Sequence, residues 1–201
     1  MARPAKGFFE GYTPKVARDL LGMVLVRMVN GERLSGAIVE TEAYRGARDP
    51  ASHAHRGKTK RNEVMFGRGG RAYVYFSYGS HWCLNVTTEP PGTAGAVLIR
   101  ALEPKEGVEV MLRNRGLGSE EHLTDGPGKL TQALGIDSNL NGEDLVDSDR
   151  LFLEKGERVK EVGLSQRIGI SKGVAFRWRF FAEGNVFVSK AKPAAQRRTH
   201  N

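Results

Sequence analysis

The feature that most constrains the fold is a series of short β-rich runs that are separated by turns more often than by helices. Asn30 and Gly31 join the first two runs, and Tyr78-Gly79-Ser80-His81 join the third and fourth, which predicts two hairpins. The predicted strands span residues 24–28, 34–44, 72–77, 82–87 and 96–102, with a final pair around residues 174–181 and 185–188.

Helical signals occur in three places. Residues 13–21 have Thr13 in the N-cap position, Pro14 at the first helical position and Gly22 just after the end. Residues 104–116 and 127–135 each begin with a proline and close with a glycine. Because strands do not alternate regularly with helices, we predict an α+β fold: a single domain with a mainly antiparallel, curved sheet of hairpins and packed helices.

Length and composition predict one intracellular domain. The 201 residues contain no Pro/Gly/Ser-rich linker, so we expect a domain over residues 1–190 and a basic, disordered tail over residues 191–201. The single cysteine, Cys83, cannot form an internal disulfide, and neither a secretory leader nor a membrane span is apparent. We therefore expect a soluble protein of a reducing compartment, with no membrane partner.

Charge points towards polyanionic partners. Lys and Arg number 31 against 23 Asp and Glu, a formal net charge of +8. Such a surface attracts nucleic acid, although the same excess can serve solubility alone.

Residues 38–44 carry two carboxylates whose placement follows from the strand period. In a strand, Glu40, Glu42 and Tyr44 share one face. A solvated outer face is the common outcome for such a pattern, but a long polar segment follows directly. Arg100 interrupts a later apolar strand, so it either pairs internally, for example with Glu42, or faces outwards or into a cleft. Asn85 interrupts its own apolar strand in the same way.

Residues 45–70 are too long and polar for a simple connection, which is typical of functional loops. His53 and His55 lie near Asp49, and with Glu42 they resemble an incomplete metal site. Because a third well-spaced His or Cys ligand is missing, we predict no metal. An imidazole can instead stack on a ring and hydrogen-bond to it.

Aromatic residues concentrate in the second hairpin. Tyr73 and Tyr75 share a face, and packing in the core is the simplest explanation for both. Tyr78 falls at the tip beside the flexible Gly79, where an exposed aromatic ring suggests a binding partner.

Taken together, these segments resemble the alkyladenine (3-methyladenine) DNA glycosylase family, in the family's order and over most of the chain. The matching segments are residues 38–44, His53, Arg61-Asn62, Met65-Phe66, residues 73–79, residues 83–85, residues 100–104 and residues 126–130. The sequence departs from the animal members at Ser80-His81-Trp82, and position 55 does not align cleanly.

The resemblance implies a set of roles. Glu42 would be the general base that activates a water, with Arg100 and a backbone carbonyl within residues 168–170 helping to place that water. Tyr44, His53 and Tyr75 would line a pocket for the flipped base, and Asn85 would act as a filter against guanine. Candidates for DNA contact are Tyr78 as a wedge in the minor groove, Tyr73 and Arg61, while the resemblance assigns no specific role to Arg61, His55 or His81.

The implied activity is that of a monofunctional DNA glycosylase, acting in base excision repair without a cofactor and most simply as a monomer. It would hydrolyse the N-glycosidic bond of 3-methyladenine or 7-methylguanine in double-stranded DNA, with hypoxanthine as a further candidate. Two alternatives stay open. A nucleic-acid-binding module would share the basic surface and the aromatic tip, and a metallohydrolase would use Glu42, His53 and His55.

Overall fold

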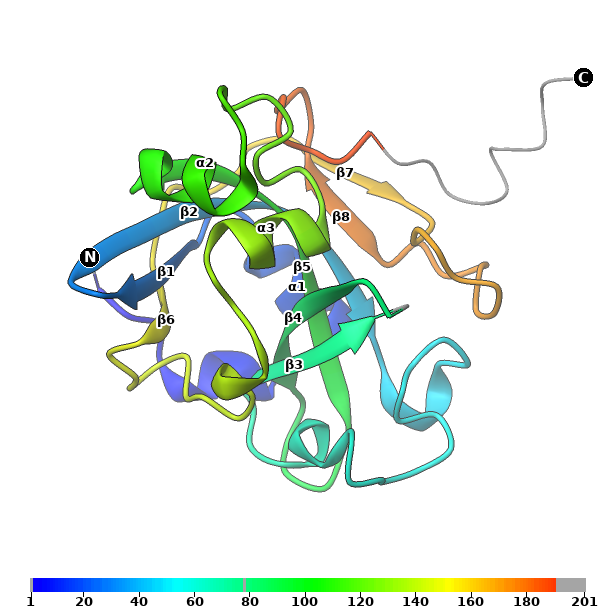
Figure 1. Cartoon of the computed structure of the whole chain (residues 1–201). Helices are drawn as coiled ribbons and strands as arrows, with labels where there is room; N and C mark the ends of the chain where they lie inside the picture. The colour runs from blue at the N-terminus through cyan, green and yellow to red at the C-terminus, as the bar shows by residue number, and fades with distance from the viewer. Residues whose placement is uncertain (1, 78, 191–201) are drawn as a thin grey trace, which may run out of the picture.

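The computed structural model describes residues 2–77 and 79–190, and within them it confirms a single α+β domain built mainly from antiparallel strands (Figure 1). Tyr78 and the predicted tail over residues 191–201 lie outside the described residues. The strands are β1 Val24–Val29, β2 Glu32–Tyr44, β3 Ala72–Ser77, β4 His81–Thr88, β5 Gly95–Glu106, β6 Leu151–Glu154, β7 Val162–Ser165 and β8 Arg179–Ala182. The helices are α1 Thr13–Asp19, α2 Val108–Arg115 and α3 Pro127–Ala133, and 3-10 turns span Lys6–Glu10, Gly46–Arg48, Glu63–Phe66 and Ser138–Leu140.

The sheet runs in the order β3-β4-β5-β2-β1-β6, and β2 also pairs with β8, which lies off this path. The first half of β2 pairs with β1, whereas Glu40, Thr41 and Glu42 pair with β8 along the same strand. Against β5, the register of β2 shifts between Ile38 and Thr41, and such irregularities increase local bending and twist. The carboxylate segment of β2 therefore lies at the centre of a curled sheet, between β5 and β8.

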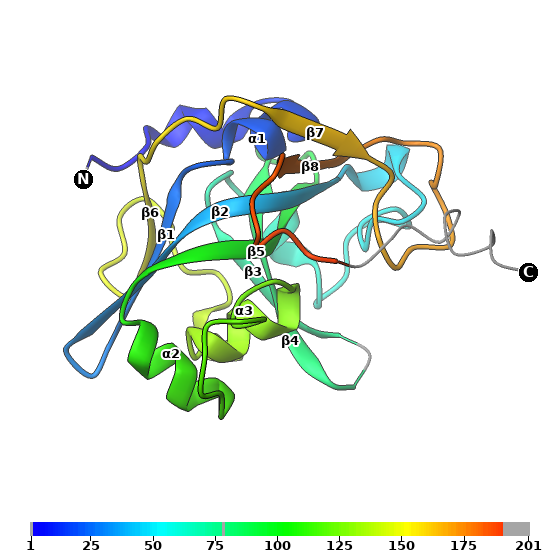
Figure 2. The same cartoon turned by 90° about the horizontal axis from the view of Figure 1, so that it is seen from above.

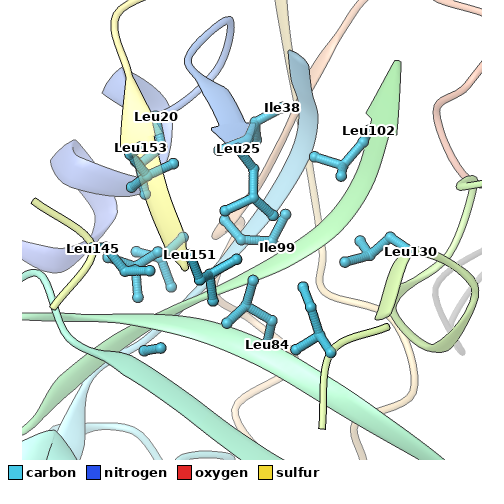
Figure 3. Packing of buried hydrophobic residues seen from close by; sticks show 14 of the residues in the cluster. Leu20, Leu25, Ile38, Leu84, Ile99, Leu102, Leu130, Leu145, Leu151 and Leu153 are labelled. Atoms are coloured by element: carbon cyan, nitrogen blue, oxygen red, sulfur yellow. The ribbon is translucent and has the colours of Figure 1, made fainter. Parts of the chain in front are cut away.

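The main core lies where the long strands meet the helices. Figure 2 shows α1 on one side of β2 and β5, with α2 and α3 on the other. Leucine and isoleucine side chains from β1, β2, β4, β5, β6 and α3, together with Leu20 just after α1, are buried and point towards one another (Figure 3). Their burial removes apolar surface from water, which is the main source of stability for a domain of this size. Across the described residues, no helix combines the length and apolarity needed to cross a membrane.

The prediction for the second helix was wrong at its N-terminus. Pro104 belongs to β5, where it pairs with Gly36 beside a register shift. A proline is tolerated at such an irregularity because one ladder hydrogen bond is already missing there. Gly107, with φ of 71°, then turns the chain into α2 at Val108.

The first helix is capped by a distant side chain rather than by a local one. The carboxylate of Glu89 accepts hydrogen bonds from the backbone N of Thr13 at 3.0 Å and from its Oγ1 at 2.7 Å. Thr13 thus begins the helix, and the acceptor for its N–H is the residue directly after β4.

The prediction for the C-terminal strands was also largely wrong. Only Arg179–Ala182 forms a strand there, and residues 185–188 contain a turn and no strand. The partners of β8 are β2 and the unpredicted β7, and the unpredicted β6 pairs with β1. β6 and β7 have four residues each, too short for their alternation to be distinguished from loop sequence.

Candidate active site

A cavity of about 480 Å³ opens between β2, the β3–β4 hairpin and the loop before β8, within the usual size range of small-molecule sites. It gathers side chains from five separate stretches of the chain. Seven residues predicted from the sequence line it: Tyr44, His53, Arg61, Tyr73, Tyr75, Asn85 and Arg100. Residues 168–170 complete the wall, as does His81.

Glu42 lies directly behind this wall and is fully buried. Its Oε1 accepts a hydrogen bond from the backbone N of Ile168 at 2.7 Å and lies 3.4 Å from the Nε of Arg100. Its Oε2 accepts a hydrogen bond from the hydroxyl of Tyr44 at 2.7 Å. Ile168, Tyr44 and Arg100 all line the cavity, so the carboxylate is held at its edge. The family resemblance in the sequence implies a backbone carbonyl of residues 168–170 near the water site, and the contact that this segment makes with Glu42 itself is the backbone N–H of Ile168.

Tyr44 is a fixed hydrogen-bond donor in this arrangement. Burial raises the pKa of its phenol well above the ordinary value, and the neighbouring Glu42 carboxylate raises it further. The guanidinium of Arg167 lies 4.6 Å from the centre of the Tyr44 ring. Arg167 therefore contacts the face of the Tyr44 ring while Glu42 accepts the hydrogen bond of its hydroxyl, and together they fix the side chain.

Glu40 shares its strand face with Glu42, as the period of two predicted, but the face is internal instead of solvated. Burial by itself would raise the pKa of Glu40, yet the guanidiniums of Arg100 and Arg179 hold that pKa below its ordinary value. Burial likewise acts to lower the pKa of Arg100, and the carboxylates of Glu42 and Glu40 raise it overall. Glu40 and Arg100 are therefore both charged at neutral pH.

Asp49 and Arg167 form a second buried ion pair beside the cavity, which the sequence pattern did not indicate. Both side chains are 0% exposed, and the guanidinium contacts the two carboxylate oxygens at 2.5 and 2.8 Å. Arg167 also donates to the backbone oxygen of Ala43 at 2.8 Å. This pair joins the loop after β2 to the segment that supplies Ile168. An acidic residue inside a Gly- and Arg-rich loop was the only local signal for it.

The aromatic wall is formed by the second hairpin and one loop histidine. The rings of His53 and Tyr75 pack edge to face with centroids 4.5 Å apart, and the Nδ1 of His53 lies 2.9 Å from the hydroxyl of Tyr73. Burial lowers the pKa of His53, with a further contribution from Arg61, so its imidazole is neutral at pH 7. Burial also raises the pKa of Tyr73 to about 12.

Tyr73, predicted to contact DNA, is buried in the cavity wall. Its side chain is 1% exposed and packs beside Tyr75, at 5.3 Å between ring centroids. Asn85 is buried and pairs with Tyr73 across the hairpin. The side-chain amide nitrogen of Asn85 donates a hydrogen bond to the backbone oxygen of Tyr73 at 3.2 Å.

Arg61 and Asn62 connect the loop to the hairpin. Arg61 is exposed at the cavity mouth, where it donates to the backbone oxygen of Phe76 at 3.1 Å. Asn62 is buried and donates to the backbone oxygens of His53 at 2.9 Å and Gly57 at 3.0 Å. Asn62 thus fixes the backbone that carries His53.

The side chains of the hypothetical metal site point in different directions. Asp49 is engaged by Arg167, and the Nδ1 of His55 faces the backbone oxygen of Ala47 at 2.9 Å. His53 faces Tyr73. In residues 2–77 and 79–190 no three His, Cys, Asp or Glu residues come together in a way that could hold a metal ion.

Comparison with known proteins identifies the family. The family model described as methylpurine-DNA glycosylase matches residues 7–186, which is most of the chain. The chain belongs to the methylpurine-DNA glycosylase family. This membership places it among the DNA glycosylases, hydrolases that act in DNA repair, and it confirms the resemblance found in the sequence.

Several bacterial relatives are similar over nearly their full length. A protein of Carboxydothermus hydrogenoformans is 55% identical over 177 residues, covering 87% of this chain and 92% of the relative. One from Chlorobium phaeovibrioides is 49% identical, covering 96% and 100%, and one from Prosthecochloris aestuarii is 48% identical, covering 96% and 94%. Each carries the name "Putative 3-methyladenine DNA glycosylase".

Proposed function

We propose that the chain excises alkylated or deaminated purines from double-stranded DNA by hydrolysing the N-glycosidic bond. The candidate substrates are 3-methyladenine, 7-methylguanine and hypoxanthine. The observation that carries this proposal is the buried Glu42 carboxylate at the edge of an aromatic cavity. Hydrogen bonds from Ile168 and Tyr44 and an ion pair with Arg100 hold it there, and all three residues line the cavity.

Glu42 is the proposed general base. An ionised carboxylate has about four lone-pair sites, and the hydrogen bonds from the Ile168 N–H to Oε1 and from the Tyr44 hydroxyl to Oε2 leave an acceptor site for a water molecule on Oε2. Hydrolysis of the bond develops positive charge on the sugar, so the same carboxylate can deprotonate the water and stabilise the transition state. Arg100 is proposed to help place the water.

The cavity is the proposed site of the flipped base. A base inside a duplex is out of reach of such a cavity, so the enzyme must extrude it, at a cost of roughly a few kcal/mol. Tyr44, His53 and Tyr75 supply ring surfaces for stacking, and a neutral His53 brings no second charge against a cationic alkylated base. Asn85 is the proposed filter against guanine, and Tyr78 the proposed wedge in the duplex.

Water as the nucleophile makes the proposed enzyme monofunctional. A lyase needs an amine that forms a Schiff base with the sugar. Among the described residues that line the cavity there is no lysine, which supports release of the base without cutting of the strand.

The test is single-turnover release of free base from duplexes that carry each candidate lesion, with a metal chelator present. We expect release by the wild type and a loss of roughly 10²-fold or more in Glu42→Gln, the range for a general base, with duplex binding retained. Glu89→Gln is the matched control, because Glu89 is also a buried carboxylate but pairs with Arg45 and Thr13.

Each alternative has its own outcome in the same assay. Tight binding of lesions without release would favour a binding module. Loss of release in chelator would favour the metallohydrolase, and strand cutting together with base release would refute the monofunctional mechanism. An unchanged rate in Glu42→Gln would refute the role of Glu42.

A further inference from the structure

We propose that Glu40 is a positioning residue for base excision, acting through Arg100. It would hold the guanidinium by its Nε, so that the terminal N–H groups face the cavity and Glu42 keeps an acceptor site for water. The proposal rests on the proposed function of Glu42, and its test separates the two.

Glu40 is held by four hydrogen bonds from protein donors and is not among the described residues that line the cavity, so it is unsuited to chemistry of its own. Its Oε1 accepts hydrogen bonds from the Nε of Arg179 at 2.6 Å, the Nε of Arg100 at 2.9 Å and the Oγ of Ser189 at 3.0 Å. Its Oε2 accepts one from the backbone N of Ser189 at 2.8 Å. Three of these four donors meet on Oε1, and the side chain is 0% exposed.

Arg100 lies between the two carboxylates but is nearer to Glu40. Its Nε is 2.9 Å from the Oε1 of Glu40 and 3.4 Å from the Oε1 of Glu42. Its terminal nitrogens make no hydrogen bond to any of the described residues, although the side chain lines the cavity. Those N–H groups are therefore available to a water or to the flipped nucleotide.

Charge balance explains why a second carboxylate is needed. The cluster contains two carboxylates, Glu40 and Glu42, and two guanidiniums, Arg100 and Arg179, so its formal charges cancel, and all four side chains are nearly or fully buried. Without the charge of Glu40, Glu42 would be the only carboxylate left to balance two buried guanidiniums. Arg100 would then move closer to Glu42, and its N–H groups would compete with water for the remaining acceptor site.

The experiment measures single-turnover base release and duplex binding for Glu40→Gln, Arg100→Lys and the double variant. We expect Glu40→Gln to slow release by roughly tenfold to a hundredfold, the value of a charge-assisted hydrogen bond, with lesion binding retained. Because Glu40 acts through Arg100, the double variant should be no slower than the slower single variant. Glu89→Gln again serves as the buried-carboxylate control.

A purely structural role predicts a different pattern. It would lower the melting temperature of Glu40→Gln but leave the rate per folded molecule unchanged, or the two single effects would multiply in the double variant. Either result would overturn the proposal. If Glu40→Gln does not fold, Glu40→Asp keeps the charge and withdraws the carboxylate by one methylene. Its rate should fall as well, and a wild-type rate would count against the proposal.

Failure of this inference can be told apart from failure of the proposed function. If the wild type releases base, Glu42→Gln does not, and Glu40→Gln is as fast as the wild type, only the role of Glu40 is refuted. If Glu42→Gln releases base at the wild-type rate, the proposed mechanism itself is refuted.

Discussion

The buried pair of Asp49 and Arg167 should make Asp49 one of the most sensitive positions in the chain. Both side chains are 0% exposed and share two hydrogen bonds. Removing one partner of such a pair leaves an uncompensated buried charge, which costs about 3–5 kcal/mol. Arg167 keeps the carbonyls of Ala43 and Gly173 as acceptors, so Asp49→Asn should fall near the lower end of that range.

The loss can be measured by urea unfolding followed by tryptophan fluorescence and circular dichroism. Trp178 is a local reporter, because its ring lies 5.4 Å from the Arg167 guanidinium. For a domain of this length, about 3 kcal/mol corresponds to a fall in melting temperature of roughly 6–12 °C. The slope of the free energy of unfolding against urea should stay unchanged if the native state is otherwise intact.

Lys15→Ala is the control for this prediction. Lys15 pairs with Asp19 on the surface of α1, where the lysine side chain is 73% exposed. Such an exposed pair contributes about 0.5 kcal/mol or less. If Asp49→Asn lost less than about 1 kcal/mol, or no more than Lys15→Ala, the reasoning from burial and unpaired charge would be refuted.

Two further predictions concern the backbone and pH. Gly22 has φ of 84°, and a Cβ there would lie 1.9 Å from the backbone oxygen of Glu157, whereas Gly31, with φ of 79°, has open space. Gly31→Ala should cost only the strain of a left-handed alanine, about 1–2 kcal/mol. Gly22→Ala should therefore have a clearly lower urea midpoint than Gly31→Ala, and equal midpoints would contradict this. Burial and Arg61 lower the pKa of His53 in the folded chain. As the pH falls through about 6.5, His53 therefore takes up a proton more readily in the unfolded chain than in the folded one, and the free energy of unfolding decreases. His53→Asn should show a weaker loss of stability between pH 7 and 5, and an unchanged pH dependence would contradict the assignment.

The sequence by itself determined the features that depend on neighbouring residues. The alternation in residues 38–44 placed Glu40 and Glu42 on one face, because successive side chains in any strand point to opposite faces. The turn residues defined both hairpins, and proline and glycine marked α3 closely. The family resemblance followed from motifs of the same local kind, and the family match confirms it.

Only the tertiary structure decided what surrounds those residues. Glu42 receives its N–H from Ile168, 126 residues away, and Glu40 is held by Arg179 and Ser189 from the end of the described chain. The strand face could equally have been solvated, and it is internal because Ile168, Arg179 and Ser189 contact its carboxylates.

Ion-pair partners and strand neighbours depend on how distant segments close upon one another, and no local period encodes that closure. The short strands β6 and β7 exist because β1 and β8 offer them hydrogen-bonding edges. The chemistry of a buried carboxylate is set in the same way, by the donors that folding brings to it.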